Sequence, residues 1–190
     1  MARKAFYFDM TACVGCRTCQ VACKDRNDLP IGIIYRQVRN FEVGKFPKPM
    51  AYNYSGTCNH CAGAKCVKGC PTGALHFVDG TVQHDRDRCV GCQYCTWNCP
   101  YGVPKFNAEK GVVGKCDMCK SWTDNGHNPI CVDACNMRVI EWGDYEELSA
   151  KHPGCVSELP ILPKASICEP SLLIRPKPCA YDTGYRLKHI

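Results

Sequence analysis

The sequence predicts an α+β protein made of two small modules, one inserted into the other, followed by an extended arm. The first observation is an internal repeat, because sixteen of the 19 cysteines fall into four groups of four. The second is a strand, turn and short helix that recur around those groups. The third is a change in composition after residue 152, where six prolines punctuate the chain. These observations predict short elements arranged around the cysteines rather than around a large aliphatic core.

Local patterns predict the secondary structure in chain order. Alternating aromatic residues predict a strand over 4–9, and a run without helix breakers predicts a short helix over 19–26. A second strand is expected over 51–56. A hairpin is expected over 74–84, because Asp79-Gly80 suits a tight turn. The remaining expected elements are helices over 92–98, 130–136 and 144–151, and a strand over 139–142.

Each cysteine group has the spacing of iron–sulfur ligands. In the first and third groups, Cys-x2-Cys-x2-Cys places three sulfurs on one loop and a fourth cysteine follows after three residues. At four thiolates per cluster, sixteen cysteines supply the ligands of four 4Fe–4S clusters. The groups are Cys13, Cys16, Cys19 and Cys23; Cys58, Cys61, Cys66 and Cys70; Cys89, Cys92, Cys95 and Cys99; and Cys116, Cys119, Cys131 and Cys135.

The ligand sets are expected to cross between groups. In two-cluster ferredoxins the fourth cysteine of one group binds the other cluster. This rule pairs the second group with the third and leaves the first to pair with the fourth. The expected ligand sets are Cys58, Cys61, Cys66 and Cys99; Cys70, Cys89, Cys92 and Cys95; Cys13, Cys16, Cys19 and Cys135; and Cys23, Cys116, Cys119 and Cys131.

The pairing also predicts the domain organisation. The contiguous middle groups predict an inserted module over 51–104, and the outer module is then split between 1–50 and 105–150. Each module is expected to hold two 4Fe–4S clusters in the ferredoxin-like βαββαβ arrangement. Residues 151–190 form the extended Pro-rich C-terminal arm.

Proline at the density found in the arm excludes long helices and central strands. Apolar patches at 159–162 and 172–174 make the arm less polar than a free disordered tail. We expect the arm to lie on a partner or, with equal weight, to cover the protein's own core. Cys155, Cys168 and Cys179 lie in the arm outside every group, and we expect ordinary thiols there.

Three residues inside the cysteine groups carry weaker signals. His60 is expected to be a solvated loop histidine, with a hydrogen bond to a cluster sulfur or a proton relay as the alternative. Tyr94 and Trp97 are expected to pack against a cluster, with a place near an electron exit as the alternative. No catalytic residue is predicted.

The formal charge of +6 suggests nucleic-acid binding, but it counts the cysteines as neutral. An oxidised 4Fe–4S core with four thiolates carries about −2, so four of them would bring the loaded protein to about −2. Zinc is the main alternative metal, because paired Cys-x2-Cys units also bind zinc. Three cysteines at x2 spacing with a fourth at x3 do not match a zinc ribbon. A zinc-dependent nucleic-acid-binding protein is therefore the remote alternative, and no nucleic-acid partner is expected.

Together the motifs resemble those of the electron-transfer (beta, iron–sulfur) subunits of the dimethyl sulfoxide reductase family of molybdopterin oxidoreductases. Some relatives replace one cysteine of the third group by tryptophan and carry a 3Fe–4S cluster, whereas all four cysteines are present here. Asn136 departs from the proline that often follows the last cysteine. The motifs that carry the resemblance are Cys13-Val14-Gly15-Cys16-Arg17-Thr18-Cys19, Cys58-Asn59-His60-Cys61, Cys70-Pro71-Thr72-Gly73-Ala74, Cys89-Val90-Gly91-Cys92-Gln93-Tyr94-Cys95 and Cys99-Pro100-Tyr101-Gly102.

The resemblance implies a non-catalytic electron-transfer subunit of an oxidoreductase complex of anaerobic respiration. Its implied partners are a large molybdopterin (Mo or W) catalytic subunit and, in many complexes, a quinone-reactive membrane anchor. The alternatives with the same electron-transfer role are a subunit of a formate dehydrogenase or hydrogenase complex and a free polyferredoxin. A free ferredoxin would have little use for the arm.

Two further expectations concern membranes and location. No stretch approaches the roughly 18 apolar residues of a membrane helix, so no direct membrane span is expected. The first residues lack the pattern of a signal peptide. The expected location is therefore the cytoplasm, or the outer face of the cytoplasmic membrane after export in the folded state with a signal-bearing partner.

Overall fold

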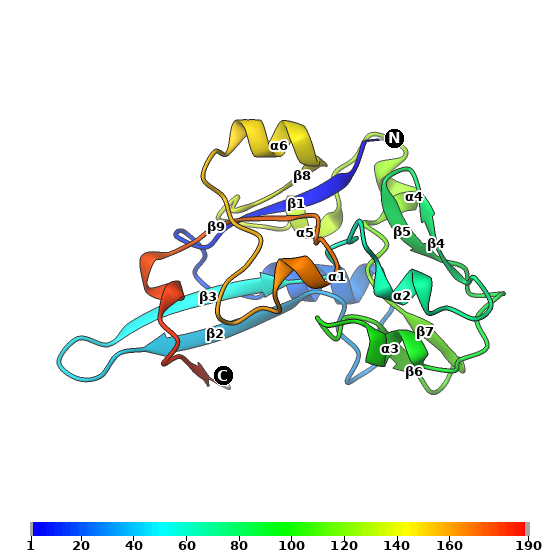
Figure 1. The fold of residues 1–190 in the computed structure, drawn as a ribbon, viewed down its shortest axis with the longest axis horizontal. Helices are drawn as coiled ribbons and strands as arrows, with labels where there is room; N and C mark the ends of the chain where they lie inside the picture. Colours follow the sequence, from blue (N-terminus) through cyan, green and yellow to red (C-terminus); the bar gives the residue numbers. More distant parts are fainter. Residues whose placement is uncertain (1, 189–190) are drawn as a thin grey trace.

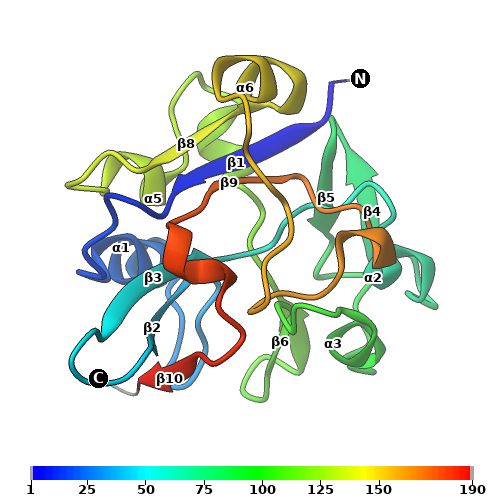
Figure 2. The same ribbon diagram turned by 60° about the vertical axis from the view of Figure 1, so that its left-hand side comes forward.

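The computed structural model describes residues 2–188, which form a mixed α/β fold. Strand β1 (Lys4–Asp9) lies in the middle of a three-stranded sheet, between antiparallel β8 (Ile140–Asp144) and parallel β9 (Leu172–Arg175) (Figure 1). Helix α6 (Tyr145–Lys151) covers one face of this sheet, so that β1 is buried on both faces. Figure 2 shows how the sheet joins the beginning of the chain to two much later segments.

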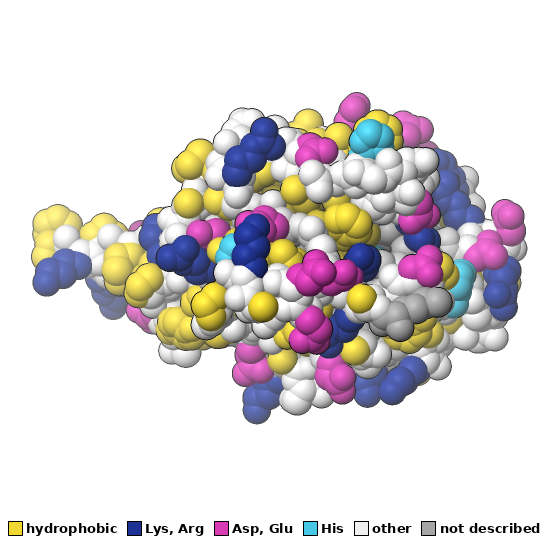
Figure 3. Space-filling view, turned by 90° about the horizontal axis from the view of Figure 1, so that it is seen from above, with side chains coloured by type: hydrophobic (Ala, Val, Ile, Leu, Met, Phe, Trp, Pro, Cys, Tyr) yellow, Lys and Arg dark blue, Asp and Glu magenta, His cyan; other side chains and the backbone are white. Residues whose placement is uncertain are grey.

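The second sheet is built on a long hairpin. Strands β2 (Gln37–Val43) and β3 (Met50–Gly56) pair along their whole length, and β10 (Arg186–Lys188) adds to the free edge of β2. The far end of this hairpin projects from the body of the molecule (Figure 1). Figure 3 shows apolar and basic side chains on the projecting end, where Phe46 is almost fully exposed.

Two short hairpins complete the strands at the opposite end of the molecule. They are formed by β4 (Leu75–Val78) with β5 (Thr81–His84), and by β6 (Lys105–Asn107) with β7 (Val112–Gly114). The β4–β5 turn has φ of 46° at Asp79 and 73° at Gly80. Positive φ at both central residues is the requirement of a type I′ turn, so the hairpin predicted from Asp79-Gly80 is confirmed.

The helices next to the cysteines are short. The longest of all the helices in the described chain is α1, with nine residues. Isolated helices of this length are not stable in water, so these helices depend on packing and on their cysteines. Across residues 2–188, no helix has both the length and the apolarity to cross a membrane. The helices that carry or flank cysteines are α1 (Thr18–Arg26), α2 (Lys65–Lys68), α3 (Tyr94–Asn98), α4 (Lys120–Thr123) and α5 (Ile130–Asp133).

The segment after residue 152 runs along the protein's own surface before it enters the first sheet. It contains the 3-10 turns η1 (Ala165–Ile167) and η2 (Pro178–Tyr181), on either side of the edge strand β9. Before β9, the N–H groups of Ala62 and Gly63 donate to the carbonyls of Glu169 and Cys168. The segment is thereby held against the loop that carries the second cysteine group.

The apolar core is divided. The larger part packs residues of β1, β2, β3 and β9 around several buried cysteines. A smaller part contains Ala64, Leu75, Val82 and Val113 with Cys95. Cysteines thus take positions in both cores that aliphatic side chains would occupy in other proteins.

Candidate iron–sulfur sites

The two Cys-x2-Cys-x2-Cys loops have the same backbone shape. Gly15 and Arg17 have φ of 73° and 64°, and their counterparts Gly91 and Gln93 have φ of 66° and 60°. A Cβ atom on Gly15 would lie 2.7 Å from the Asn40 side-chain nitrogen, and one on Gly91 would lie 2.3 Å from the Gly111 carbonyl oxygen. Glycine is therefore required at both positions, for its left-handed φ and for space. Each loop then leads into a helix, α1 or α3, that carries the third cysteine.

Cys13, Cys16, Cys19 and Cys135 (the Cys13 set) line one small cavity. Three of these residues come from the first loop, and Cys135 follows α5 more than one hundred residues later. The hydroxyl of Thr18 donates to Cys16 Sγ at 3.4 Å, and Ser55 Oγ lies 3.4 Å from Cys19 Sγ. The Cys16 side chain is exposed, so this set reaches the surface.

Cys70, Cys89, Cys92 and Cys95 (the Cys70 set) line a second small cavity. Burial, with the neighbouring Cys70 thiol, raises the pKa of Cys95 to about 11. Cys70 differs, because the N–H of Leu75 and the Thr72 hydroxyl outweigh its burial and lower its pKa. Cys92 is exposed, as Cys16 is at the other loop.

Cys58, Cys61, Cys66 and Cys99 (the Cys58 set) line a third small cavity. Burial and the neighbouring Cys58 thiol raise the pKa of Cys66 to about 12, although the Lys115 ammonium opposes this shift. Lys115 lies in the cavity wall, is 5% exposed, and donates from Nζ to the carbonyls of Cys116 and Val82. A buried cation therefore stands beside these four thiols.

Cys23, Cys116, Cys119 and Cys131 (the Cys23 set) are all buried. Burial and the neighbouring Cys131 thiol raise the pKa of Cys23 to about 12. The N–H of Met118 donates to Cys116 Sγ at 3.4 Å. The structure thus brings α1 and the 116–119 turn together around α5.

Shared helices and one pair of neighbouring cysteines connect the four sets in a definite order. On α1, Cys19 and Cys23 are one turn apart and belong to two different sets, as do Cys131 and Cys135 at α5. Helix α2 similarly links the Cys58 set with the Cys70 set, and so does α3. Cys116 of the Cys23 set lies close enough to Cys58 for their charges to interact. The order is therefore the Cys13 set, the Cys23 set, the Cys58 set and the Cys70 set.

The donor chemistry of these sets fits iron–sulfur clusters. Each offers four sulfur atoms, and soft thiolates select iron–sulfur clusters, zinc and Cu(I). The raised pKa values of Cys23, Cys66 and Cys95 mean that these thiols stay protonated unless a positive core is bound. A single zinc ion needs ligands about 2.3 Å away. In the part of the chain that the structure describes, no three His, Cys, Asp or Glu side chains converge on one point in that way.

Two expectations about aromatic residues near the cysteines are wrong. His60 is buried, not solvated: its Nδ1 accepts from the Val82 N–H at 2.9 Å, and burial lowers its pKa so that it stays neutral. The covering contacts come from β5 and from Ser171, which lies far away in the sequence. Trp97 does not pack inside, since 84% of its surface is exposed, and Tyr94 is half exposed against Gly69.

Sequence reasoning also missed residues that surround the sulfurs. Cys168, expected to be an ordinary thiol, is buried and lines the cavity of the Cys58 set. Arg36 and Lys115 are buried cations. Neither has a spacing motif that could have revealed it, because each is covered by segments distant in the sequence.

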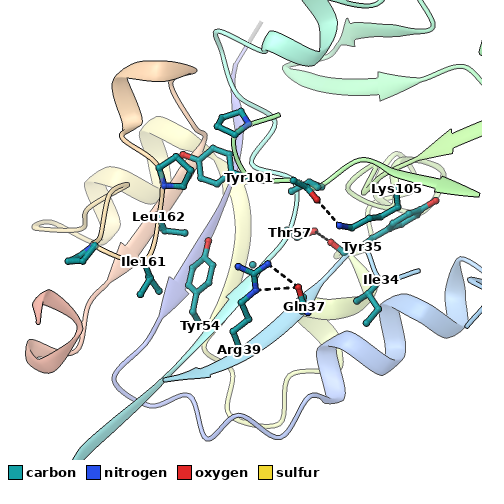
Figure 4. A pocket seen from close by; sticks show the side chains of 16 residues that line it. Ile34, Tyr35, Gln37, Arg39, Tyr54, Thr57, Tyr101, Lys105, Ile161 and Leu162 are labelled. Atoms are coloured by element: carbon teal, nitrogen blue, oxygen red, sulfur yellow. Dashed lines mark hydrogen bonds between the residues drawn. The ribbon is translucent and has the colours of Figure 1, made fainter. Parts of the chain in front are cut away.

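A larger hollow of about 350 Å³ lies outside the cysteine sets, between β2, β3 and the segment 160–163 (Figure 4). Arg39, Tyr54 and Tyr101 line it, and Arg39 donates to the Gln37 side chain at its mouth. No cysteine lines this hollow. It approaches the Cys58 set through Pro100, Tyr101 and Val103, which line both the hollow and the cavity of that set.

Comparison with known proteins also indicates that the cysteines bind iron–sulfur clusters. Residues 50–145 match the family model described as a 4Fe-4S dicluster domain. The protein is therefore an iron–sulfur protein of the electron-transfer class, not a catalytic subunit.

Full-length relatives define the family more closely. The sequence is 41% identical over 193 residues to the probable anaerobic dimethyl sulfoxide reductase chain YnfG of Escherichia coli, covering 95% of this protein and 94% of that one. It is 39% identical to the B subunit of the anaerobic dimethyl sulfoxide reductase of Haemophilus influenzae, with coverage of 97% and 94%. The formate dehydrogenase iron-sulfur subunit of Wolinella succinogenes is 30% identical, over 78% of this protein and 84% of that one. The protein belongs to the family of dimethyl sulfoxide reductase iron–sulfur subunits, and the resemblance seen in its motifs is confirmed.

Proposed function

We propose that this protein binds four 4Fe–4S clusters and relays electrons between a large molybdopterin catalytic subunit and a second redox partner, a quinone-linked membrane subunit where the complex has one. The main supporting observation is that three cavities each bring together the four cysteines of one crossed set, with Cys168 as an additional thiol in the cavity of the Cys58 set. The remaining four cysteines are buried beside one another. The Cys13, Cys23, Cys58 and Cys70 sets are the proposed ligand sets.

The same arrangement supports two ferredoxin-like modules, one inserted in the other. The smaller core draws its members from residues 61–113, close to the proposed inserted module over 51–104. The strands β1 and β8, from the proposed outer module over 1–50 and 105–150, pair directly. Residues 151–190 are the proposed extended arm.

The cysteines and the backbone have separate roles in this proposal. When bound, the clusters supply reversible one-electron chemistry. The thiolates hold the clusters, the surrounding apolar residues exclude water, and N–H and hydroxyl groups that donate to sulfur stabilise the reduced charge. Because electron tunnelling decays exponentially with distance, ligands of two sets on one short helix keep neighbouring clusters close.

The Cys13 set and the Cys70 set, which are first and last in this order, are the expected places for electron exchange with partner proteins. Cys16 at one end and Cys92 at the other are the exposed ligands of their sets. Apolar side chains are exposed beside both, with Val14 and Val21 at the first end and Val90 and Trp97 at the second. Exposed apolar patches are typical of protein–protein contacts, which supports a partner at each end.

Metal analysis and co-purification test the proposal. The anaerobically purified protein should be brown and contain about sixteen iron and sixteen sulfide per molecule. It should co-purify with a large subunit that contains a molybdopterin cofactor. A colourless protein with about four zinc would contradict the proposal and support the zinc-dependent alternative.

A formate dehydrogenase complex is the second candidate, because the iron-sulfur subunit of such an enzyme is among the relatives. The higher identity and coverage of the dimethyl sulfoxide reductase subunits favour the first. The purified complex separates them directly: reduction of dimethyl sulfoxide by a reduced dye supports the first candidate, and oxidation of formate supports the second.

A further inference from the structure

Arg36 is a buried cation at the junction of the Cys13 and Cys23 sets. It precedes β2 and is 2% exposed. Its Nη1 donates to the Ser55 carbonyl oxygen at 3.3 Å and to Ser55 Oγ at 3.1 Å. Its Nε and Nη2 find no hydrogen-bond partner within residues 2–188. Its Cζ lies 4.7 Å from the centre of the Phe6 ring.

The groups that compensate this buried charge are thiols and not carboxylates. The neighbours whose charges act on Arg36 are the sulfurs of Cys131, Cys19, Cys116 and Cys23. No carboxylate within the described chain forms an ion pair with Arg36. A buried guanidinium without a neighbouring anion strongly destabilises a folded protein. Its position therefore makes physical sense when anionic sulfur sites stand on both sides.

Arg36 also contacts both sets directly or through one residue. Its backbone N–H donates to the Cys23 sulfur. Ser55 Oγ, which accepts from Arg36, lies 3.4 Å from Cys19 Sγ. Because the serine oxygen already accepts from the guanidinium, its O–H is free to donate to that sulfur. A continuous polar path thus joins the guanidinium to a ligand of the Cys13 set.

Resting on the function proposed above, we propose that Arg36 sets the reduction potentials of the two clusters held by the Cys13 and Cys23 sets. Reduction adds one negative charge to a cluster that is already anionic. A fixed positive charge between the two sites favours the reduced form of each and raises both potentials. Ser55 transmits a further part of this effect to the Cys13 set alone, through its hydrogen bond to Cys19.

Potentiometric titration followed by electron paramagnetic resonance (EPR) tests the proposal on the iron-loaded full-length protein. Arg36→Gln removes the charge and keeps an amide donor for Ser55. We expect the ratio of reduced to oxidised cluster at a fixed potential to fall about tenfold or more at two of four clusters, equivalent to 59 mV for a one-electron couple. Arg36→Lys should restore most of the shift. Ser55→Ala should lower one of the same two potentials, and Arg39→Gln, on the exposed face of β2, should change none.

The outcomes separate a charge effect from a structural one. Unchanged potentials in a fully loaded Arg36→Gln, or an equal shift in Arg36→Lys, would overturn the proposal. Arg36→Met is a second neutral variant in case glutamine prevents loading. If both neutral variants fail to bind the clusters and Arg36→Lys binds them, the result supports a requirement for the positive charge. If all three variants fail to bind the clusters, the proposal is overturned. A wild-type protein with fewer than four clusters would instead contradict the proposed function, before any variant is compared.

Discussion

The crossed pairing of cysteine groups makes a quantitative prediction about double variants. Cys19 and Cys23 lie one turn apart on α1, yet they are assigned to different clusters. Cys119 is assigned to the same cluster as Cys23. Removing two ligands of one cluster should therefore cost one cluster, and removing one ligand from each of two clusters should cost two.

Iron content gives the expected magnitudes. Starting from about sixteen iron, Cys19→Ala, Cys23→Ala and Cys119→Ala should each retain about twelve. The Cys23→Ala/Cys119→Ala protein should also retain about twelve, because both changes act on the same cluster. Cys19→Ala/Cys23→Ala should retain about eight.

The assay is iron and sulfide analysis of anaerobically purified variants, with EPR spin counting of the reduced clusters. A site left with three ligands can keep a 3Fe–4S cluster. In that case the EPR spectrum should show one altered cluster in Cys23→Ala/Cys119→Ala and two altered clusters in Cys19→Ala/Cys23→Ala. If the groups bound clusters without crossing, the two double variants would exchange their results. About eight iron in Cys23→Ala/Cys119→Ala, with about twelve in Cys19→Ala/Cys23→Ala, would refute the crossed assignment.

Three other perturbations have outcomes fixed by the structure. Gly91→Ala should lower the free energy of unfolding by about 2 kcal/mol or more and remove the iron of one cluster, because an alanine there has a strained positive φ and its Cβ clashes with the Gly111 carbonyl oxygen. Gly111→Ala is the control, because it has the same backbone strain but no clash, and thermal unfolding should show a loss of only about 1 kcal/mol. Tyr52 has a buried hydroxyl with no hydrogen-bond partner in the described chain, and burial raises its pKa to about 12. Below pH 10 the phenol is neutral in both the folded and the unfolded state. Between pH 10 and 12 the unfolded state ionises first, so wild type should lose stability across that window and the stability of Tyr52→Phe relative to wild type should grow; equal alkaline losses in both proteins would contradict this. Oxidative removal of iron with a chelator should abolish most of the helical circular dichroism, since the short helices have little stability of their own, and an unchanged spectrum would show that the clusters are not needed for the fold.

Local patterns were sufficient for part of the fold. The strand over 4–9, the helix over 19–26 and the Asp79-Gly80 hairpin each depend on residues adjacent in sequence, and all three are found. The helix expected over 130–136 ends at Asp133 instead. The Cys135 N–H bonds to the Val132 carbonyl, and this tighter turn leads out of the helix.

Elements that depend on distant partners were not predicted. The apolar residues at 172–174 are recognisable in the sequence, but their parallel pairing with β1 joins segments more than one hundred and sixty residues apart. The strand β2 was missed because its burial does not alternate regularly, with Asn40 half buried beside Asn53. His60 looked solvated for the same reason, since its covering groups come from β5 and the arm.

The candidate ligands and their electrostatic surroundings are specified by different kinds of information. A loop of three cysteines covers three corners of a cluster by covalent geometry alone, so spacing predicts the ligands and leaves one corner for another segment. Arg36 follows Tyr35 and precedes Gln37, a local sequence typical of an exposed strand. It is buried because distant segments cover it, among them Phe6, Ser55 and the segments that carry the cysteines. Lys115 is likewise held by carbonyls of Val82 and Cys116 beside the Cys58 set. Because a fixed cation shifts the potential of a nearby cluster, proteins with the same cysteine spacing but neutral residues at these two positions should carry electrons at lower potentials. In the proposed assignment, the spacing of the cysteines determines the number of sites and most of their ligands, and the three-dimensional packing determines the energy at which each site accepts an electron.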